Sequence, residues 1–393
     1  MNQNICHLWV AISLSALGGC VAVATITENP DNSQPVQPAS WAYETVTELS
    51  AELNGLDVVL DDADQLHISL VDGNHLDYLT HDEVHWVRDP VDRAGGREGN
   101  PSAIRVDESG RVHHAYWKGG YVMYAQGEEM DWNVESLHKV SSATSPFVSL
   151  SLSASAHMAV RYSGQVWHLS EEDAWAFSGV ALGYAQWNAM EFDKDGIGHL
   201  ITVDHLISQA DTEAQQLHGT FAIRHGRYDD GEWEIQAPIE SHEGWLGYPD
   251  LDWRGRLPST AVDLVLDGSG RLHLAYFFAV DPDDPATPWV LRYAVQTAQG
   301  WAIETIDAQA SVGYHVSLAL GPDGTPHVSY FHDGEQQVYY GTRQEGSWLT
   351  QAIEPSVASG PRSGIVVSSG SLVSVVYPSD GQLRRGILEP APE

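Results

Sequence analysis

Six histidines stand at the same place in a repeated motif, and histidine suits both metal binding and proton transfer near neutral pH. Residues 266–278 read LDGSGRLHLAYFF, and similar text stands at 106–117 (VDESGRVHHAYW) and 320–331 (LGPDGTPHVSYF). The six are His67, His113, His157, His199, His273 and His327. A seventh copy of the motif, SGSLVSVVY at 369–377, contains no histidine.

The elements that carry these histidines are predicted to be short strands. Each repeat has an apolar segment, a histidine segment, a segment with tyrosines and a segment that opens with tryptophan. The tryptophans are Trp41, Trp86, Trp132, Trp175, Trp233, Trp301 and Trp348. Apolar and polar residues alternate in these segments, and β-branched and aromatic residues are enriched, which favours strands. The D-x-x-G or D-G sequences between the first two segments supply the positive φ that a tight hairpin turn needs. Four-stranded units at this period are typical of a β-propeller.

The two ends of the repeat region fit together. The segment WAYETV at 41–46 is a lone fourth strand, whereas the segments near 364–386 lack a fourth strand. Pairing them would close the ring and remove an exposed sheet edge. We therefore predict an all-β fold, a seven-bladed β-propeller over 41–393 with four-stranded blades, whose strand 41–46 completes the last blade.

The repeat resembles bacterial exported propeller repeats of the form D-x-x-G-x-x-H-ϕ-x-Y followed by Y and G-x-W-x-ϕ-E, and the resemblance covers 41–388. It is also distantly similar to sialidase-like and BNR-type propellers, some of which are glycosidases or polysaccharide lyases. The Asp-box of sialidases, S-x-D-x-G-x-x-W, is absent from this sequence. The resemblance therefore implies a fold more than an activity.

The repeated histidines are predicted to be structural. Facing sheets pack about 10 Å apart, whereas the ligands of one zinc ion lie about 2 Å from it, so equivalent histidines cannot share an ion. We expect each imidazole to bond to backbone at the first hairpin turn or to the neighbouring blade, because buried polar groups need partners. We expect the tryptophans to wedge between the outer edges of neighbouring blades.

The first residues are predicted to be an export leader. The apolar stretch 8–18 is too short to span a bilayer as a helix, and it precedes Leu17-Gly18-Gly19-Cys20, which resembles the bacterial lipobox L-x-G-C. In that interpretation 1–19 is a signal peptide, Cys20 carries lipid, and 20–40 is a flexible tether. The protein would then be a lipoprotein of the outer membrane or cell surface. An ordinary signal peptide cut elsewhere is the alternative.

The chain is acidic, with 54 Asp and Glu against 19 Lys and Arg. Such a surface disfavours nucleic acid and anionic lipid as partners, because both need a basic patch. No P-loop, Rossmann, G-x-S-x-G or C-x-x-C motif is present, so no cofactor or metal site is predicted. The loops DKDG at 193–196, DDAD at 61–64 and DPDDP at 281–285 resemble Ca²⁺ loops only weakly.

Long connections are predicted to gather on one face of the ring: 88–102, 203–219, 236–259 and 277–289. Long loops on a rigid repeat commonly carry binding sites. Residues entering the inner strands should line the mouth of the central channel, and the loop 242–256 is rich in aromatic, carboxylate and guanidinium groups, which suit a sugar. Trp245 and Trp253 could instead only anchor the loop. The predicted binding residues are Trp187, Asn188, Tyr314, His315 and Arg362 at the mouth, and His242, Trp245, Tyr248, Asp250, Asp252, Trp253, Arg254 and Arg256 in the loop.

Three functions are compatible with these features. The first is non-catalytic binding of a glycan or a protein by a monomer, and the second is a purely structural assembly subunit. The third is a polysaccharide lyase or glycosidase, in which His332 or Tyr330 would remove a proton beside a uronate carboxylate and Arg254, Arg256 or Arg362 would neutralise that carboxylate.

Overall fold

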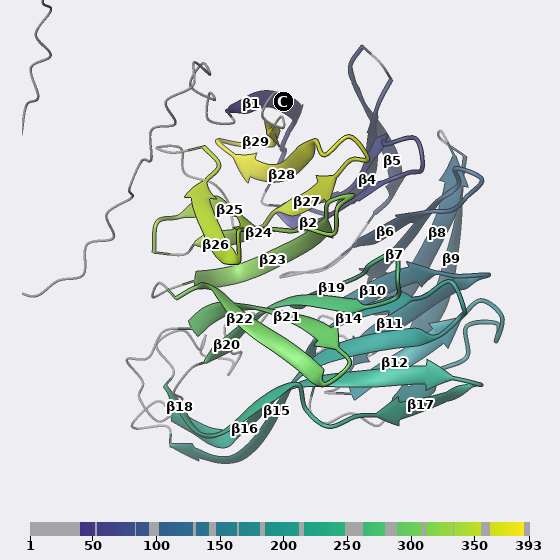
Figure 1. Ribbon diagram of the computed structural model, residues 1–393. Helices are drawn as coiled ribbons and strands as arrows, with labels where there is room; N and C mark the ends of the chain where they lie inside the picture. The colour runs from purple at the N-terminus through teal and green to yellow at the C-terminus, as the bar shows by residue number, and fades with distance from the viewer. Residues whose placement is uncertain are drawn as a thin grey trace, which may run out of the picture. The chain divides into compact units, whose positions relative to one another are not determined.

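A computed structural model describes residues 40–388, apart from 52, 83, 94–101, 129–130, 141–146, 163–164, 181–184, 212–215, 248–261, 280–288, 309–311, 333 and 355–361. The regular structure of these described residues is entirely β-strand. They form seven antiparallel sheets, and each sheet has a path of four hydrogen-bonded strands (Figure 1). The predicted all-β, seven-bladed β-propeller is therefore confirmed.

In blades I to VI the four strands of this path follow the order of the sequence from the inner edge outward. Blade I contains β2 (Leu53–Leu60), β3 (Leu66–Asp72), β4 (His75–His81) and β5 (Trp86–Asp92). Blade II contains β6 (Ala103–Val106), β7 (Val112–Lys118), β8 (Tyr121–Glu128) and β9 (Asp131–Lys139), and blade III contains β10 (Phe147–Leu152), β11 (Ala156–Tyr162), β12 (Gln165–Ser170) and β13 (Ser178–Val180). Blade IV contains β14 (Ala185–Phe192), β15 (Gly198–Asp211), β16 (Gln216–Asp229) and β17 (Glu232–Ile235), with β18 (Glu240–Gly247) also paired to β16.

Blade V contains β19 (Val262–Leu266), β20 (Leu272–Ala279), β21 (Trp289–Thr297) and β22 (Gly300–Asp307). Blade VI contains β23 (Val312–Leu320), β24 (Pro326–His332), β25 (Gln337–Gln344) and β26 (Ser347–Ala352). Blade VII contains β27 (Gly364–Val367), β28 (Val373–Ser379), β29 (Gln382–Leu388) and, on its outer edge, β1 (Trp41–Glu48). The N-terminal strand thus completes the last blade as predicted, with Trp41 opposite Leu388 and Glu48 opposite Gln382.

The first strands of the blades surround a central channel. Each of them contacts the first strand of the next blade, in the closed order β2, β6, β10, β14, β19, β23, β27 and again β2. The apolar core lies between blades, where each neighbouring pair encloses one cluster of buried side chains. The rigid position of the seven inner strands follows from this packing of every blade on both neighbours.

The repeated aspartate, histidine and tyrosine of the motif form one contact chain inside a blade. In blade II, Asp107 accepts hydrogen bonds from the backbone of Ser109 and Arg111 in the first turn. His113 Nε2 lies 3.2 Å from Asp107 Oδ2, and its Nδ1 lies 2.6 Å from the Tyr124 hydroxyl. The same histidine to third-strand contact is found for His67 with Tyr78, His273 with Tyr293, His327 with Tyr340, His157 with His168 and His199 with His225.

This contact corrects our expectation for the histidines. The histidine bonds a side chain of its own blade instead of backbone or the neighbouring blade, because a third-strand tyrosine, or a histidine in blades III and IV, lies beside it in the same buried layer. The link to the next blade is made by tryptophan, as predicted. Trp175 of blade III lies 4.7 Å from Tyr124 of blade II, centroid to centroid. Equivalent pairs join Trp132 to Tyr78, Trp233 to His168, Trp301 to His225, Trp348 to Tyr293 and Trp41 to Tyr340.

Two predicted segments differ in the structure. The strand expected to start at Trp175 starts at Ser178, because Trp175 itself adopts a turn conformation with φ of 62°. The segment 203–219, expected as an irregular loop, is largely strand: β15 and β16 pair as far as Asp211 and Gln216. With β18 they form an arm of blade IV (Figure 1), in which Gly247 pairs with Gln216 and Glu240 with Ile223. Hydrogen bonding along three strands stabilises this sequence without a repeat motif.

Candidate functional site

The candidate site is a cavity of about 120 Å³ in the channel, lined by all seven inner strands. Its polar and aromatic lining includes Asp57, Ser102, Arg105, Phe147, Ser149, Trp187, Asn188, Glu191, Asp263 and His315. They come from blades I to VI, so the site exists only in the closed ring. Apart from Asp57 and Asp263, which occupy equivalent positions in blades I and V, they differ in type from blade to blade.

One wall of the cavity is aromatic. Phe147 begins β10 and Trp187 lies near the start of β14, with ring centroids 4.0 Å apart and planes inclined by 33°. The guanidinium carbon of the buried Arg161 lies 5.9 Å from the centre of the Phe147 ring, a cation–π distance. Beside the rings, the Ser149 hydroxyl donates to Asn188 Oδ1 at 2.6 Å. This wall combines an apolar surface with a fixed amide.

The other feature of the cavity is a charged group of three carboxylates and one guanidinium. Arg105 donates to Glu191 and lies 3.5 Å from Asp57 Oδ2. Asp57 lines the cavity and keeps 31 % of its side-chain surface exposed. Burial raises the pKa of Asp57, against the opposing charge of Arg105. Burial also disfavours the charged form of Arg105, but Glu191 and Asp57 outweigh it and raise the pKa of Arg105.

Asp263 lines the same cavity. Within the described residues no hydrogen bond or ion pair joins it to Arg105, although the charge of Arg105 lowers its pKa. Its carboxylate accepts hydrogen bonds from the backbone N–H groups of Leu264 at 2.9 Å and of Leu318 at 2.7 Å. Burial raises the pKa of Asp263 to about 7, and the charge of Asp57 acts in the same direction. Asp57 makes the equivalent backbone contacts with Val58 and Ile104. Both aspartates thus join neighbouring inner strands while facing the channel.

Two further polar atoms of the lining have no hydrogen-bond partner among the described residues: Ser102 Oγ and His315 Nδ1. Burial lowers the pKa of His315 to about 3, and the neighbouring Arg362 adds to this effect, so His315 is neutral at physiological pH. Buried polar groups without partners are uncommon in folded proteins. The cavity therefore offers bonding capacity that the protein itself leaves unused.

Some of the residues predicted to line the mouth of the channel lie together in the cavity. Trp187, Asn188 and His315 line the cavity, and Arg362 acts electrostatically on His315. Tyr314 belongs to β23, but its side chain lies outside the described residues.

The predicted loop residues are separate from this cavity lining or lie outside the described residues. His242 and Trp245 belong to β18 of the arm, opposite Phe221 and His218, and the side chain of Trp245 is not described. The remaining predicted residues lie outside the described residues: Tyr248, Asp250, Asp252, Trp253, Arg254 and Arg256.

The residues of the lyase hypothesis are built into contacts between blades. Tyr330 is fully buried, and its hydroxyl donates to Asp307 Oδ2 at 2.7 Å. Tyrosines at the same place in three other blades donate to a carboxylate of the preceding blade: Tyr116 to Asp92, Tyr276 to Glu240 and Tyr377 to Glu354. His332 is 5 % exposed and packs on Tyr339, and neither it nor Tyr330 lines the cavity. Repetition in four blades indicates a structural role for Tyr330.

Our sequence analysis missed Asp57, Arg105, Glu191 and Asp263. The sequence feature that could have identified them is a single charged residue inside an otherwise mostly apolar inner strand. It is seen in LDVVL, AIRV, AMEF and VDLVL. A second cavity, of about 350 Å³, lies between blades II and III and is larger. Its polar residues Asp107, Arg111 and His113 belong to the first turn of blade II and its contact chain, so we assign it to the scaffold.

Within the described residues, no group of three or more His, Cys, Asp or Glu side chains is placed to hold a metal ion. The loops at 61–64 and 193–196 are first turns, in which Asp61 and Asp193 accept backbone hydrogen bonds. The loop 281–285 lies outside the described residues. Among the described residues, there is also no helix long and apolar enough to span a membrane.

No protein-family model and no curated protein sequence matches this chain. Solved structures do match it. A catalytically inactive virginiamycin B lyase from Staphylococcus aureus with quinupristin has a TM-score of 0.52 at 9 % identity, over 89 % of this chain and 100 % of that one. The polysaccharide lyase Uly1 has a TM-score of 0.51 at 10 % identity, over 91 % of each chain. A streptogramin B lyase has a TM-score of 0.50 at 10 % identity, over 89 % of this chain and 98 % of that one. Similarity at this level shows a common propeller fold and does not show a common activity.

Proposed function

We propose that this protein binds a carbohydrate without catalysis, and that the ligand enters the channel beside Trp187. The observation that carries the proposal is the composition of one cavity, with the Phe147–Trp187 pair on one wall and polar groups on the others. Sugars have apolar faces that pack on aromatic rings and hydroxyls that need several hydrogen bonds. Asn188, Ser102 and His315 provide groups of that kind.

The size of the cavity limits what enters it. At about 120 Å³ it is smaller than the pockets of roughly 300–1,000 Å³ that bind drug-sized ligands. We therefore expect a single terminal sugar ring to insert, while the rest of a glycan stays outside the mouth. The lyase hypothesis gains no support from the geometry, because Tyr330 is engaged with Asp307 and His332 lies away from the cavity.

The binding proposal is tested by Trp187→Ala on a glycan array. Loss of one stacking wall should weaken binding about tenfold or more, which corresponds to about 1.4 kcal/mol. The melting temperature of the variant is measured alongside, because Trp187 also packs on the apolar cluster between blades IV and V. The control is Leu349→Ala, which removes an apolar side chain that is 54 % exposed on the outer strand β26. Equal binding by the wild type and both variants would refute the site.

We further propose that Cys20 anchors the propeller to the cell envelope through the tether 20–40. The support is the lipobox-like sequence LGGC at 17–20 alone. A Cys20→Ser variant should lose incorporation of a labelled fatty acid and move from the membrane fraction to the soluble fraction. Labelling that persists in this variant would contradict the anchor.

A further inference from the structure

In the lining of the cavity, acidic side chains outnumber basic ones. Among the residues that line the cavity, Asp57, Glu191 and Asp263 face one guanidinium, that of Arg105. Arg105 pairs with Glu191 and approaches Asp57. The hydrogen bonds to the carboxylate of Asp263 within the described part of the chain come from two backbone N–H groups, those of Leu264 and Leu318. The single charge of Arg105 is therefore shared among three acidic side chains, because it acts on Asp263 as well as on Glu191 and Asp57.

These carboxylates are fixed in place before any ligand arrives. Asp57 and Asp263 each hold the backbone of their own inner strand and of the next one, so neither side chain is free to swing out of the channel. The charge of Asp57 acts on Asp263 across the channel. A preorganised pair of acceptors of this kind binds a cation with little loss of conformational entropy.

The lining also contains an unused partner for such a ligand. Ser102 is 3 % exposed and lines the cavity, and its hydroxyl oxygen has no hydrogen-bond partner among the described residues. The carboxylates are not gathered tightly enough to share a metal ion, since the described residues contain no group of three placed to do so. The arrangement instead suits an organic cation that spans the channel with several N–H donors.

We propose that the sugar bound in this cavity carries an ammonium group, as a hexosamine with a free amine does. This inference rests on the proposed carbohydrate-binding function. The ring lies against Trp187 and Phe147, while the ammonium donates to Asp263 and Asp57. The same carboxylates, on a chain of net charge −35, repel uronates and sulfated sugars. The site thus selects its ligand by charge.

The test is a panel of hexosamines with gluco, galacto and manno configuration, each offered as the free amine and as the N-acetylated form. Isothermal titration at constant ionic strength should show the free amine of the preferred sugar binding at least tenfold tighter. Asp263→Asn, which keeps shape and one acceptor oxygen, should reduce this preference severalfold, and so should Asp57→Asn. The matched control is Glu108→Gln, which removes an exposed carboxylate from the first turn of blade II. It should leave the preference unchanged.

The outcomes separate the two proposals. Equal binding of amine and N-acetylated forms, with loss of both in Trp187→Ala, would overturn the charge selection and leave carbohydrate binding in place. Sugar affinity that is unchanged in Trp187→Ala would overturn the carbohydrate site. The wild-type ratio of affinities decides the matter even if the Asp263→Asn ring fails to fold, and a preference that vanishes in Asp57→Asn but not in Glu108→Gln supports the channel as its source.

Discussion

At the scale of single residues, the repeated histidines act as connectors between a turn and a third strand. His327 Nδ1 lies 2.7 Å from the hydroxyl of Tyr340, and that tyrosine packs against Trp41 of the next blade. Burial lowers the pKa of His327 to about 4. The histidine therefore serves the fold as a neutral ring, and its protonation works against the folded state.

The pH dependence of stability follows from that lowered pKa. The unfolded chain has a histidine pKa of about 6.5, so the unfolded state binds more protons between pH 6.5 and 4. The contribution of His327 is complete above pH 6.5 and is lost as pH falls toward 4, by about 3 kcal/mol at most. We expect the free energy of unfolding of wild type, relative to a His327→Gln variant, to fall over this range when measured by urea titration.

Comparison with the variant isolates this histidine from the carboxylates, which titrate in both proteins. His75→Gln is the control, since His75 is exposed at the start of β4. A wild-type curve that runs parallel to the His327→Gln curve from pH 7 to pH 4.5 would show that His327 is not held neutral by the fold.

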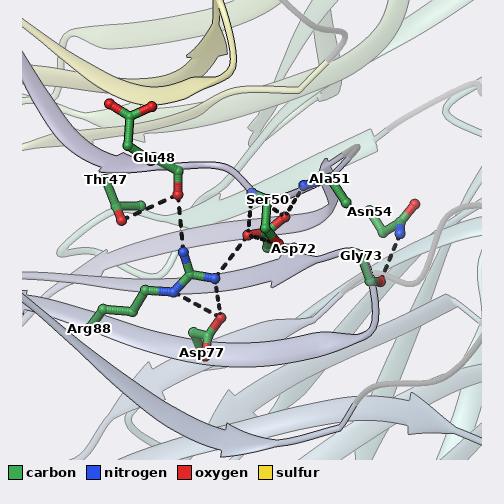
Figure 2. A network of polar contacts seen from close by, with 9 residues as sticks. All are labelled: Thr47, Glu48, Ser50, Ala51, Asn54, Asp72, Gly73, Asp77 and Arg88. Atoms are coloured by element: carbon green, nitrogen blue, oxygen red, sulfur yellow. Dashed lines mark hydrogen bonds and ion pairs between the residues drawn. The ribbon is translucent and has the colours of Figure 1, made fainter.

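At the scale of elements, the closure of the ring depends on the segment between β1 and β2. Figure 2 shows the network that holds it: the carboxylate of Asp72 accepts from the backbone of Ser50 and Ala51. Arg88 on β5 donates from Nη2 to Asp72 at 2.9 Å and to Asp77 at 2.6 Å. Burial raises the pKa of Asp72, but the hydrogen bonds from Ser50 and Arg88 outweigh it, and the net shift is downward. Hydrogen bonds from blade I thereby hold the end of β1, the strand that completes blade VII, and the residues that follow it.

Arg88→Ala should destabilise the ring. The side chain of Asp72 is 0 % exposed, and loss of the guanidinium leaves a buried carboxylate without its cation, which costs on the order of 3 kcal/mol. The control is Arg343→Ala, because Arg343 pairs with Glu304 through side chains that are 40 % and 33 % exposed. That pair should contribute at most about 1 kcal/mol. Equal unfolding free energies for the two variants would show that the network does not secure closure.

Elements also show where local sequence misleads. β15 and β16 are 14 residues each, whereas strands average about 5–6 residues. Their outer halves lack the motif residues, so the sequence indicated a loop. Pairing with β18 supplies the stability, and that strand lies after β17 in a segment that was also expected to be irregular. The strand propensity of individual residues does not predict such pairing between segments that are distant in the sequence.

At the scale of the whole molecule, a regular ring carries an irregular channel. The motif residues repeat from blade to blade because each blade must pack on two neighbours in the same way. The channel lining is free of that requirement, and it includes Asp57 in blade I, Arg105 in blade II and Trp187 in blade IV. Function on such a scaffold is expected where the repeats differ.

The sequence by itself determined the strand content, the number of blades and the closure by Trp41–Glu48. The alternation of apolar and polar residues, the turn residues and the incomplete first and last repeats can all be recognised in short stretches of sequence. It also placed Trp187, Asn188 and His315 near the channel. It did not reveal the partner of each histidine, which lies from 11 to 26 residues away. Only the tertiary structure brought Asp57, Arg105 and Asp263 to one cavity. Ring closure places the inner strands of all seven blades around one channel, although these strands are far apart in the sequence.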